Sequence, residues 1–209
     1  GKVYRIGNKE EFYEIYSKGI REKKQYYHII ERAPKDYGPV NIDFDFKWEI
    51  EDEEAEIERK IEMSSIKEIC EMIKDYMKTN TESEEESVYD YTLFARNGPY
   101  IKDGKLKDGV HIQFPQCVID YKFQQHMRSA LLVPIDAKLE KYGMYEPIEK
   151  MYDKSIIGGN WLMYGSCKPG LESYQIVYPE QKVRPGDIER LVRLYSQQNK
   201  PERTCQVRG

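Results

Sequence analysis

The clearest pattern in the chain is the strict alternation of polar and apolar residues over 40–48, which reads Val-Asn-Ile-Asp-Phe-Asp-Phe-Lys-Trp. Side chains alternate between the two faces of a β-strand, so this segment is predicted to be a strand with one apolar face. Asp43 and Asp45 then share the polar face, separated by roughly 6.6 Å along the strand. Two carboxylates are therefore expected to project together from one element.

Apolar residues recur at helical spacing in several other segments. The spacing of Asn8 and Glu11 is that of a capping box, and Ser65 with Glu68 repeats it before the next apolar stripe. Pro134 is expected to end the third helix, and Asp187 to open the last one. The predicted helices cover 9–23, 65–77, 120–132, 136–142 and 187–195.

Further strands are indicated by short β-branched and aromatic runs between turn residues. Two of them, 88–95 and 110–115, are expected to be joined by a hairpin that is rich in Gly and Lys and holds Asp103-Gly104 and Asp108-Gly109. The remaining strand predictions are 26–30, 160–166 and 173–178.

The net charge of −4 conceals an uneven distribution of charges along the chain. Residues 49–62 carry −6 and residues 82–86 carry −4, so the rest of the chain carries +6. A basic body with acidic insertions suits a polyanionic partner, although such charge runs are also typical of solvated loops.

Composition narrows the class of protein. The 18 tyrosines favour an ordered fold, since aromatic side chains supply large buried areas. No apolar run approaches the roughly 20 residues that span a bilayer, and the first residues lack the apolar core of a secretory signal, so we expect an intracellular protein without membrane contact. The four cysteines form no CxxC pair, which favours free thiols over a zinc ribbon or a disulfide framework.

Three segments carry candidate chemistry. Asp43 and Asp45 offer the oxygen ligands that Mg²⁺ and Mn²⁺ prefer, although an exposed sheet face balanced by Lys47 would show the same pattern. His111 lies on the strand that begins after Asp108-Gly109. Asp153 precedes the strand predicted at 160–166, and the turn after that strand, Gly-Ser-Cys-Lys, can meet phosphate through its amides and ammonium group. A P-loop pattern is absent from the sequence, so ATP hydrolysis by that route is not expected.

Together these segments resemble the three motifs of the archaeo-eukaryotic primase superfamily. The matching stretches are Asp43-Phe-Asp45, Gly109-Val-His111, and Asp153 followed by Asn-Trp-Leu-Met-Tyr-Gly-Ser. The amino-acid sequence of these stretches is similar to that of the N-terminal primase domain of primase-helicases from large nucleocytoplasmic DNA viruses. The resemblance implies an α+β fold, with an RRM-like antiparallel sheet and a second mixed α/β subdomain. It also implies that residues 1–209 form one catalytic domain of a longer protein.

The resemblance further implies roles for individual residues. Asp43, Asp45 and Asp153 would bind catalytic Mg²⁺ or Mn²⁺, and His111 would hold the phosphates or sugar of the incoming nucleotide. Phosphate contacts are expected from four more residues on the same motifs or beside them: Lys168, Ser166, Arg96 and Lys107.

The function implied is that of a DNA primase or primase-polymerase, which makes primers on single-stranded DNA from NTPs or dNTPs. A hexameric helicase outside this chain would be the attached partner, and the cytoplasm of an infected host cell the site of action. Two alternatives remain open: a catalytically inactive module that binds single-stranded DNA or nucleotide, and a metal-dependent nuclease. The preference between ribonucleotides and deoxyribonucleotides is also open.

Overall fold

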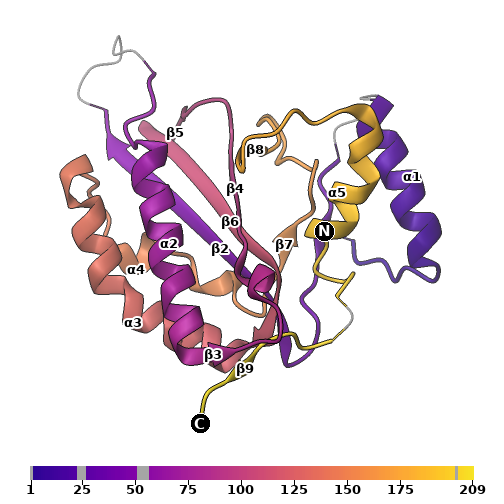
Figure 1. The fold of residues 1–209 in the computed structure, drawn as a ribbon. Helices are drawn as coiled ribbons and strands as arrows, with labels where there is room; N and C mark the ends of the chain where they lie inside the picture. Colours follow the sequence, from indigo (N-terminus) through magenta and orange to yellow (C-terminus); the bar gives the residue numbers. More distant parts are fainter. Residues whose placement is uncertain (1, 23–26, 51–56, 201) are drawn as a thin grey trace.

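The centre of the protein is an antiparallel sheet, seen in a computed structural model that describes residues 2–22, 27–50, 57–200 and 202–209. Figure 1 shows its long strands crossing the molecule. Its order is β2 (Tyr37–Glu49), β6 (Lys105–Asp120), β4 (Thr92–Ala95) and β8 (Gln175–Tyr178), and β5 (Tyr100–Lys102) pairs with the start of β6. β2 is therefore one edge of the sheet.

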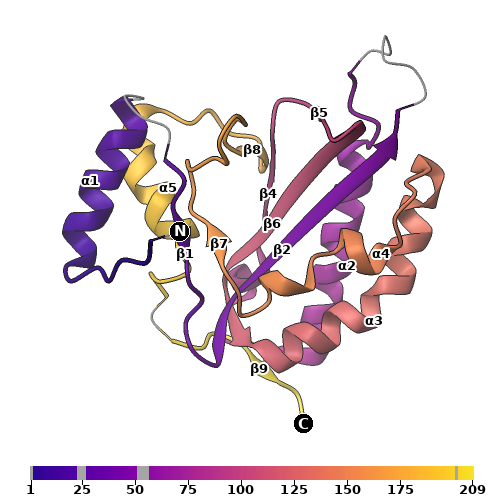
Figure 2. The same ribbon diagram turned by 180° about the vertical axis from the view of Figure 1, so that it is seen from behind.

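The alternation along β2 is realised in space. Phe44, Phe46 and Trp48 are buried on the face that packs against α2 (Met63–Asn80) and α3 (Tyr121–Leu139), which lie side by side in Figures 1 and 2. Helix α4 (Ile148–Met151) lies between β2 and α3 (Figure 2). The apolar face of the sheet thus forms the main core, and the opposite, polar face carries Asp43 and Asp45.

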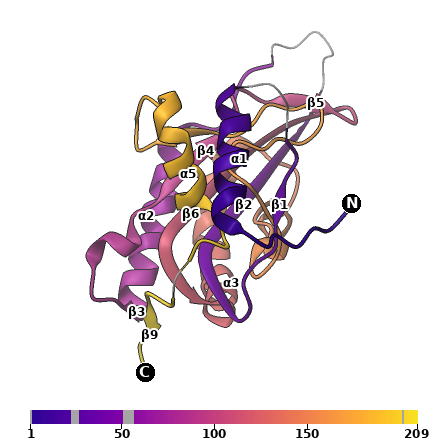
Figure 3. The same cartoon turned by 90° about the vertical axis from the view of Figure 1, so that its right-hand side faces the viewer.

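A second, smaller part of the fold faces the polar side of the sheet. It contains α1 (Lys9–Glu22), α5 (Ile188–Tyr195) and the two-stranded pair β1 (Ile30–Glu31) and β7 (Trp161–Leu162), which Figure 2 shows together. The side view in Figure 3 shows α1 next to α5. The protein is therefore an α+β fold with an antiparallel sheet and a second subdomain, as the resemblance implied.

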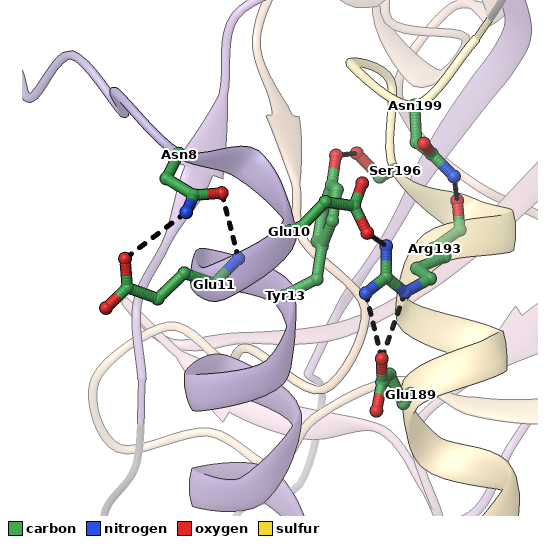
Figure 4. Close-up of polar contacts among 8 residues, drawn as sticks. All are labelled: Asn8, Glu10, Glu11, Tyr13, Glu189, Arg193, Ser196 and Asn199. Atoms are coloured by element: carbon green, nitrogen blue, oxygen red, sulfur yellow. Dashed lines mark hydrogen bonds and ion pairs between the residues drawn. The ribbon is translucent and has the colours of Figure 1, made fainter.

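Side-chain contacts join the two helices of this second part (Figure 4). Arg193 of α5 forms ion pairs with Glu10 of α1 and with Glu189 of its own helix. The Tyr13 hydroxyl lies 2.8 Å from Ser196 Oγ, just past the end of α5. These contacts hold the start of the chain against its last helix.

Short elements complete the chain. Strands β3 (Thr81–Glu82) and β9 (Gln206–Val207) pair with each other. The described residues also form the 3₁₀ turns η1 (Glu86–Tyr89), η2 (Glu140–Tyr142), η3 (Lys154–Ile156) and η4 (Pro185–Asp187). No helix among the described residues is long and apolar enough to span a membrane. All four cysteines are free and buried.

Most predicted helices and strands are present, with specific corrections at the helices. The capping box at Asn8 is confirmed, because its Oδ1 accepts a hydrogen bond from Glu11 N at 3.2 Å (Figure 4). The predicted cap at Ser65 is wrong: α2 starts two residues earlier, and the Ser65 hydroxyl lies 2.7 Å from the Tyr142 hydroxyl. The predicted break at Pro134 is also wrong, since buried Leu131, Ile135 and Leu139 continue the apolar stripe of α3 through it.

Several strand and loop boundaries also differ from prediction. Strand β6 begins at Lys105, so Asp108-Gly109 lies inside a strand, and only Asp103-Gly104 forms a turn, with φ of 55° and 68°. Of the segment 88–95 only β4 is a strand, and of 160–166 only β7. Of the strand predicted at 26–30, only Ile30, where β1 starts, is a strand residue. Residues 23–26 and 51–56 lie outside the described residues. The tract 82–86 was predicted to be a loop, and 83–85 connects β3 to η1, but Glu82 ends β3 and Glu86 begins η1.

Candidate active site

The pairing of β2 with β6 brings two of the sequence motifs together. Asp43 lies directly opposite His111, and Asp45 lies opposite Gly109. The Nε2 atom of His111 is 3.5 Å from Oδ1 of Asp43. Residues that face each other in an antiparallel pair share one face of the sheet, so the histidine and both carboxylates lie on the polar face.

Asp153 reaches this place along the free edge of β2. Tyr152, the residue that follows α4, forms an isolated bridge with Phe44, and Asp153 N donates a 3.0 Å hydrogen bond to Asp43 O. The carboxylate of Asp153 accepts hydrogen bonds from Ser155 N at 2.8 Å and from Ser155 Oγ at 2.9 Å. The third motif is therefore beside the first, with its side chain capping the turn that follows.

Asp43 is the most perturbed acid of the group. Burial is the largest cause of a rise in its pKa to about 8; the nearby Asp45 and Asp153 add to this rise, and Lys168 and Arg96 oppose it. Its Oδ1 atom is buried without a hydrogen-bond partner among the described residues. A buried carboxylate with acidic neighbours and an unsatisfied oxygen needs either a proton or a cation, because leaving the charge unpaired there is costly.

His111 is held by aromatic rings and kept uncharged. Its ring stacks on Tyr174 with a centroid distance of 3.7 Å, and Trp161 lies at 4.6 Å on a tilted plane. Burial lowers the pKa of His111 well below its ordinary value, and the charges of Arg96 and Lys168 lower it further. At neutral pH this imidazole therefore has one donor and one acceptor nitrogen to offer a ligand.

Tyr174 explains why glycine occupies position 109. A Cβ atom built on Gly109 would lie 2.9 Å from the Tyr174 hydroxyl and 3.3 Å from Phe44 O, closer than such atoms normally approach. Arg96 covers the other side of the tyrosine, with its guanidinium carbon 4.1 Å from the ring centroid and Nη1 3.0 Å from the hydroxyl. The stack of Arg96, Tyr174 and His111 thus fixes the imidazole over the sheet.

An ion pair between partly exposed Arg59 and buried Asp108 supports the site from the apolar face. Arg59 Nε donates to Asp108 Oδ2 at 2.8 Å, and Arg59 Nη2 donates to Arg96 O at 2.7 Å. The other oxygen of Asp108 accepts from Gly109 N at 2.9 Å. Arg59 therefore ties the end of β4 to β6 immediately beside the motif that carries the histidine.

The phosphate contacts predicted from sequence have different surroundings. Lys168 is exposed, and its charge affects both Asp43 and His111, which places it within electrostatic range of the site. Ser166 is buried; its hydroxyl lies 2.8 Å from Tyr16 Oη and accepts from Ile29 N. Further along the polar face, Lys107 pairs with Asp103 in the hairpin.

These environments qualify the predicted phosphate roles. Arg96, which was also predicted to meet phosphate, is buried against Tyr174. The roles of Ser166, Lys107 and Arg96 stay predictions, and the position of Lys168 suits its role best.

Sequence reasoning missed four residues that shape the site. The missed residues are Arg59, Asp108, Tyr174 and Arg128, and the last of these donates from its guanidinium to Tyr152 O, just before Asp153. Only Gly109 gave a local signal, because a glycine inside a strand indicates close approach of another group.

The carboxylate oxygens of the site are of the type that binds hard divalent cations, but in this structure they do not converge as a complete ligand set. Among the described residues, no three His, Cys, Asp or Glu side chains are placed to hold one metal ion. Asp43 offers the unsatisfied Oδ1. Among the neighbouring acids, Asp45 has the largest effect on the pKa of Asp43, and the Asp153 carboxylate is hydrogen-bonded to Ser155. The donor chemistry fits Mg²⁺ or Mn²⁺, provided that Asp153 turns away from the loop it caps.

The chain is similar to known proteins over most of its length. The family described as the C962R protein N-terminal AEP domain matches residues 1–178. A putative helicase of Acanthamoeba polyphaga mimivirus is 28% identical over an alignment of 149 residues that covers 68% of this chain. The matched region is only 14% of that viral protein's length.

Proposed function

Because the chain belongs to the family of C962R N-terminal AEP domains, we propose that it is a metal-dependent nucleotidyltransferase that synthesises primers on single-stranded DNA. The observation that carries the proposal is the pairing of Asp43 with His111 across β2 and β6, with Asp153 tied to the same strand. A site for nucleotide transfer requires carboxylates and a phosphate-binding group within a few Å of each other, and the pairing brings them together.

In this proposal Asp43, Asp45 and Asp153 hold Mg²⁺ or Mn²⁺. When bound, the metal lowers the pKa of the attacking 3'-hydroxyl and neutralises charge that develops on the phosphate. The protein itself orients the substrate: neutral His111 offers a hydrogen bond to the phosphates or sugar, and Lys168 offers a positive charge. The stacked rings of Tyr174 and Trp161 keep the imidazole in one orientation, so that little entropy is lost when nucleotide binds.

The larger setting of the domain is also part of the proposal. The matched relative is viral and is named as a helicase, so we infer that this chain works beside a helicase during DNA replication in an infected cell. NTPs or dNTPs would be the substrates and single-stranded DNA the template. The helicase assembly, a hexamer in this proposal, would place the domain on the unwound strand.

The direct test is product formation on a single-stranded template with nucleotides and Mn²⁺. Wild type should give extended products with release of pyrophosphate, and Asp43→Asn should lose at least 100-fold in rate, since a metal ligand is removed. Asp75→Asn changes an exposed acid on α2 and serves as the matched control with unchanged rate. Products that persist in Asp43→Asn would contradict the assigned site, and shortened template strands would indicate a nuclease.

One observation favours a second candidate, a binding module without activity. The Asp153 carboxylate is bonded to Ser155, and a three-ligand metal site is absent from the described residues. Calorimetry with nucleotide, with and without Mn²⁺, separates the two functions. The catalytic proposal expects binding that depends on the metal and weakens in His111→Ala, whereas a simple module would bind nucleotide regardless of both.

A further inference from the structure

A basic pocket opens at the free edge of the sheet, beside the segment that delivers Asp153. It is lined by α3 and by the first residue of η3, and its residues are Lys122, Gln125, His126, Arg128, Ser129 and Lys154. We call it the α3 pocket. Three of the six side chains carry a fixed positive charge and none is a carboxylate, although the whole chain has a net charge of −4.

These positive charges are not neutralised by the protein. Across the described ranges, Lys122, Arg128 and Lys154 form no ion pair with a carboxylate. Most other lysines near the sheet are paired, for example Lys47 with Glu146. An unpaired cluster that lines a concave site attracts anions, because the low-dielectric walls concentrate its field.

Arg128 gives the pocket a rigid floor. Its side chain is buried, and Nε and Nη2 both donate to Tyr152 O, at 3.0 and 2.7 Å, while Nη2 also donates to Glu149 O. Its Nη1 atom has no hydrogen-bond acceptor among the residues that the structure describes. This nitrogen is also absent from the fully buried, unsatisfied atoms of those residues, so it remains accessible to a ligand. A guanidinium fixed on two sides in this way can present its last nitrogen to a phosphate at little entropic cost.

The same residues connect the pocket to the candidate active site. The carbonyl of Tyr152 that Arg128 binds belongs to the residue bridged to Phe44, and Asp153 follows it. Lys154, which lines the pocket, is the next residue in the chain, about 3.8 Å away between Cα atoms. Figure 2 shows the intervening α4 between β2 and α3. The pocket therefore lies one residue beyond a predicted metal ligand.

We propose that the α3 pocket binds a backbone phosphate of the single-stranded nucleic acid on which the domain acts. This inference rests on the proposed function for the identity of the strand. The nucleotide's own phosphates are expected on the polar face of the sheet, near His111 and Lys168, whereas the α3 pocket lies around the edge of β2. A phosphate in that place belongs to a chain that continues past the active site.

The test is fluorescence anisotropy of a labelled single-stranded oligonucleotide with the double variant Lys122→Ala/Lys154→Ala, over a range of salt concentrations. Loss of the one phosphate contact made by this pocket should reduce the magnitude of the slope of log K against log salt by about 0.7, which weakens binding about 5-fold at 0.1 M salt. Lys18→Ala/Lys182→Ala removes two exposed lysines elsewhere and is the matched control, with wild-type affinity expected. Arg128 is left intact because it anchors the segment before Asp153.

A second measurement separates this proposal from the proposed function. Binding of a nucleoside triphosphate in the presence of Mn²⁺ should be unchanged in the Lys122/Lys154 double variant. Unchanged strand affinity and salt slope would overturn the pocket proposal even if the wild type makes primers. Weakened triphosphate binding would also overturn it, since the pocket would then serve the nucleotide. Weakened strand binding alone supports it, even if the protein proves unable to synthesise primers.

Discussion

Replacing Asp43 with asparagine should stabilise the metal-free protein while it abolishes activity. The pKa of Asp43 rises from its ordinary value of 3.8 to about 8 in the folded protein, chiefly because the side chain is buried. At pH 7 the unfolded chain therefore carries an ionised carboxylate that the folded chain must protonate. At about 1.4 kcal/mol for each pKa unit, the 3.2 units between 3.8 and pH 7 cost folding about 4 kcal/mol.

The sign of the pH dependence follows from the same values. A group whose pKa is raised by folding adds stability that is complete below pH 4 and is lost as the pH rises through 8. The gain of Asp43→Asn over wild type should therefore grow by about 2.7 kcal/mol between pH 5 and pH 7. Because the measured quantity is the difference in unfolding free energy between two proteins, the contributions of other titrating groups to it largely cancel.

The assay is urea denaturation in EDTA at several pH values, with Asp75→Asn as a control expected to stay within about 0.5 kcal/mol of wild type. Adding Mn²⁺ should then stabilise wild type and leave Asp43→Asn unchanged, since a ligand that binds only the folded state shifts the equilibrium toward it. A difference that does not vary with pH, or a variant less stable than wild type at pH 7, would refute the reasoning.

Three further substitutions test the support of the site, each by urea denaturation at pH 7. Arg59→Ala leaves buried Asp108 without its ion-pair partner and should cost about 3–5 kcal/mol; a loss below 1 kcal/mol would show that the pair is dispensable. Phe44→Ala empties a fully buried position and should also cost about 3–5 kcal/mol, and a smaller loss would mean that the core closes around the gap. Lys47→Ala removes a half-exposed pair with Glu146 and should cost less than about 1 kcal/mol; a loss above 2 would contradict that estimate.

Local sequence pattern was a good guide wherever one face of an element is buried. The alternation over 40–48 correctly predicted a strand with Asp43 and Asp45 on one face, because period-two burial is visible in the residues themselves. The register that sets His111 opposite Asp43 was not predictable by counting residues, since β2 and β6 are separated by α2 and β4. It depends on long-range packing, and the family resemblance supplied it indirectly.

Other features had no local signal at all. Asp153 is positioned by the bridge between Tyr152 and Phe44, a contact between segments about a hundred residues apart. In the sequence Arg128 is indistinguishable from a helix-surface arginine, and only the structure shows its bonds to the carbonyl of Glu149 in α4 and to that of Tyr152 just after it. Proline usually interrupts a helix, yet α3 continues through Pro134. The reason is that burial of Ile135 and Leu139 outweighs the one lost backbone hydrogen bond.

The register between β2 and β6 also limits how this chain can vary in length. From Val40 to Glu49 the two strands pair without interruption, and the irregularity at Pro39 lies outside this stretch. A single residue inserted into the paired stretch would turn every later side chain to the opposite face, so aspartates would enter the core and phenylalanines would enter the site. Homologous chains should therefore accept insertions before β2, or in the turn at Asp103-Gly104, and should conserve the spacing within the paired strands.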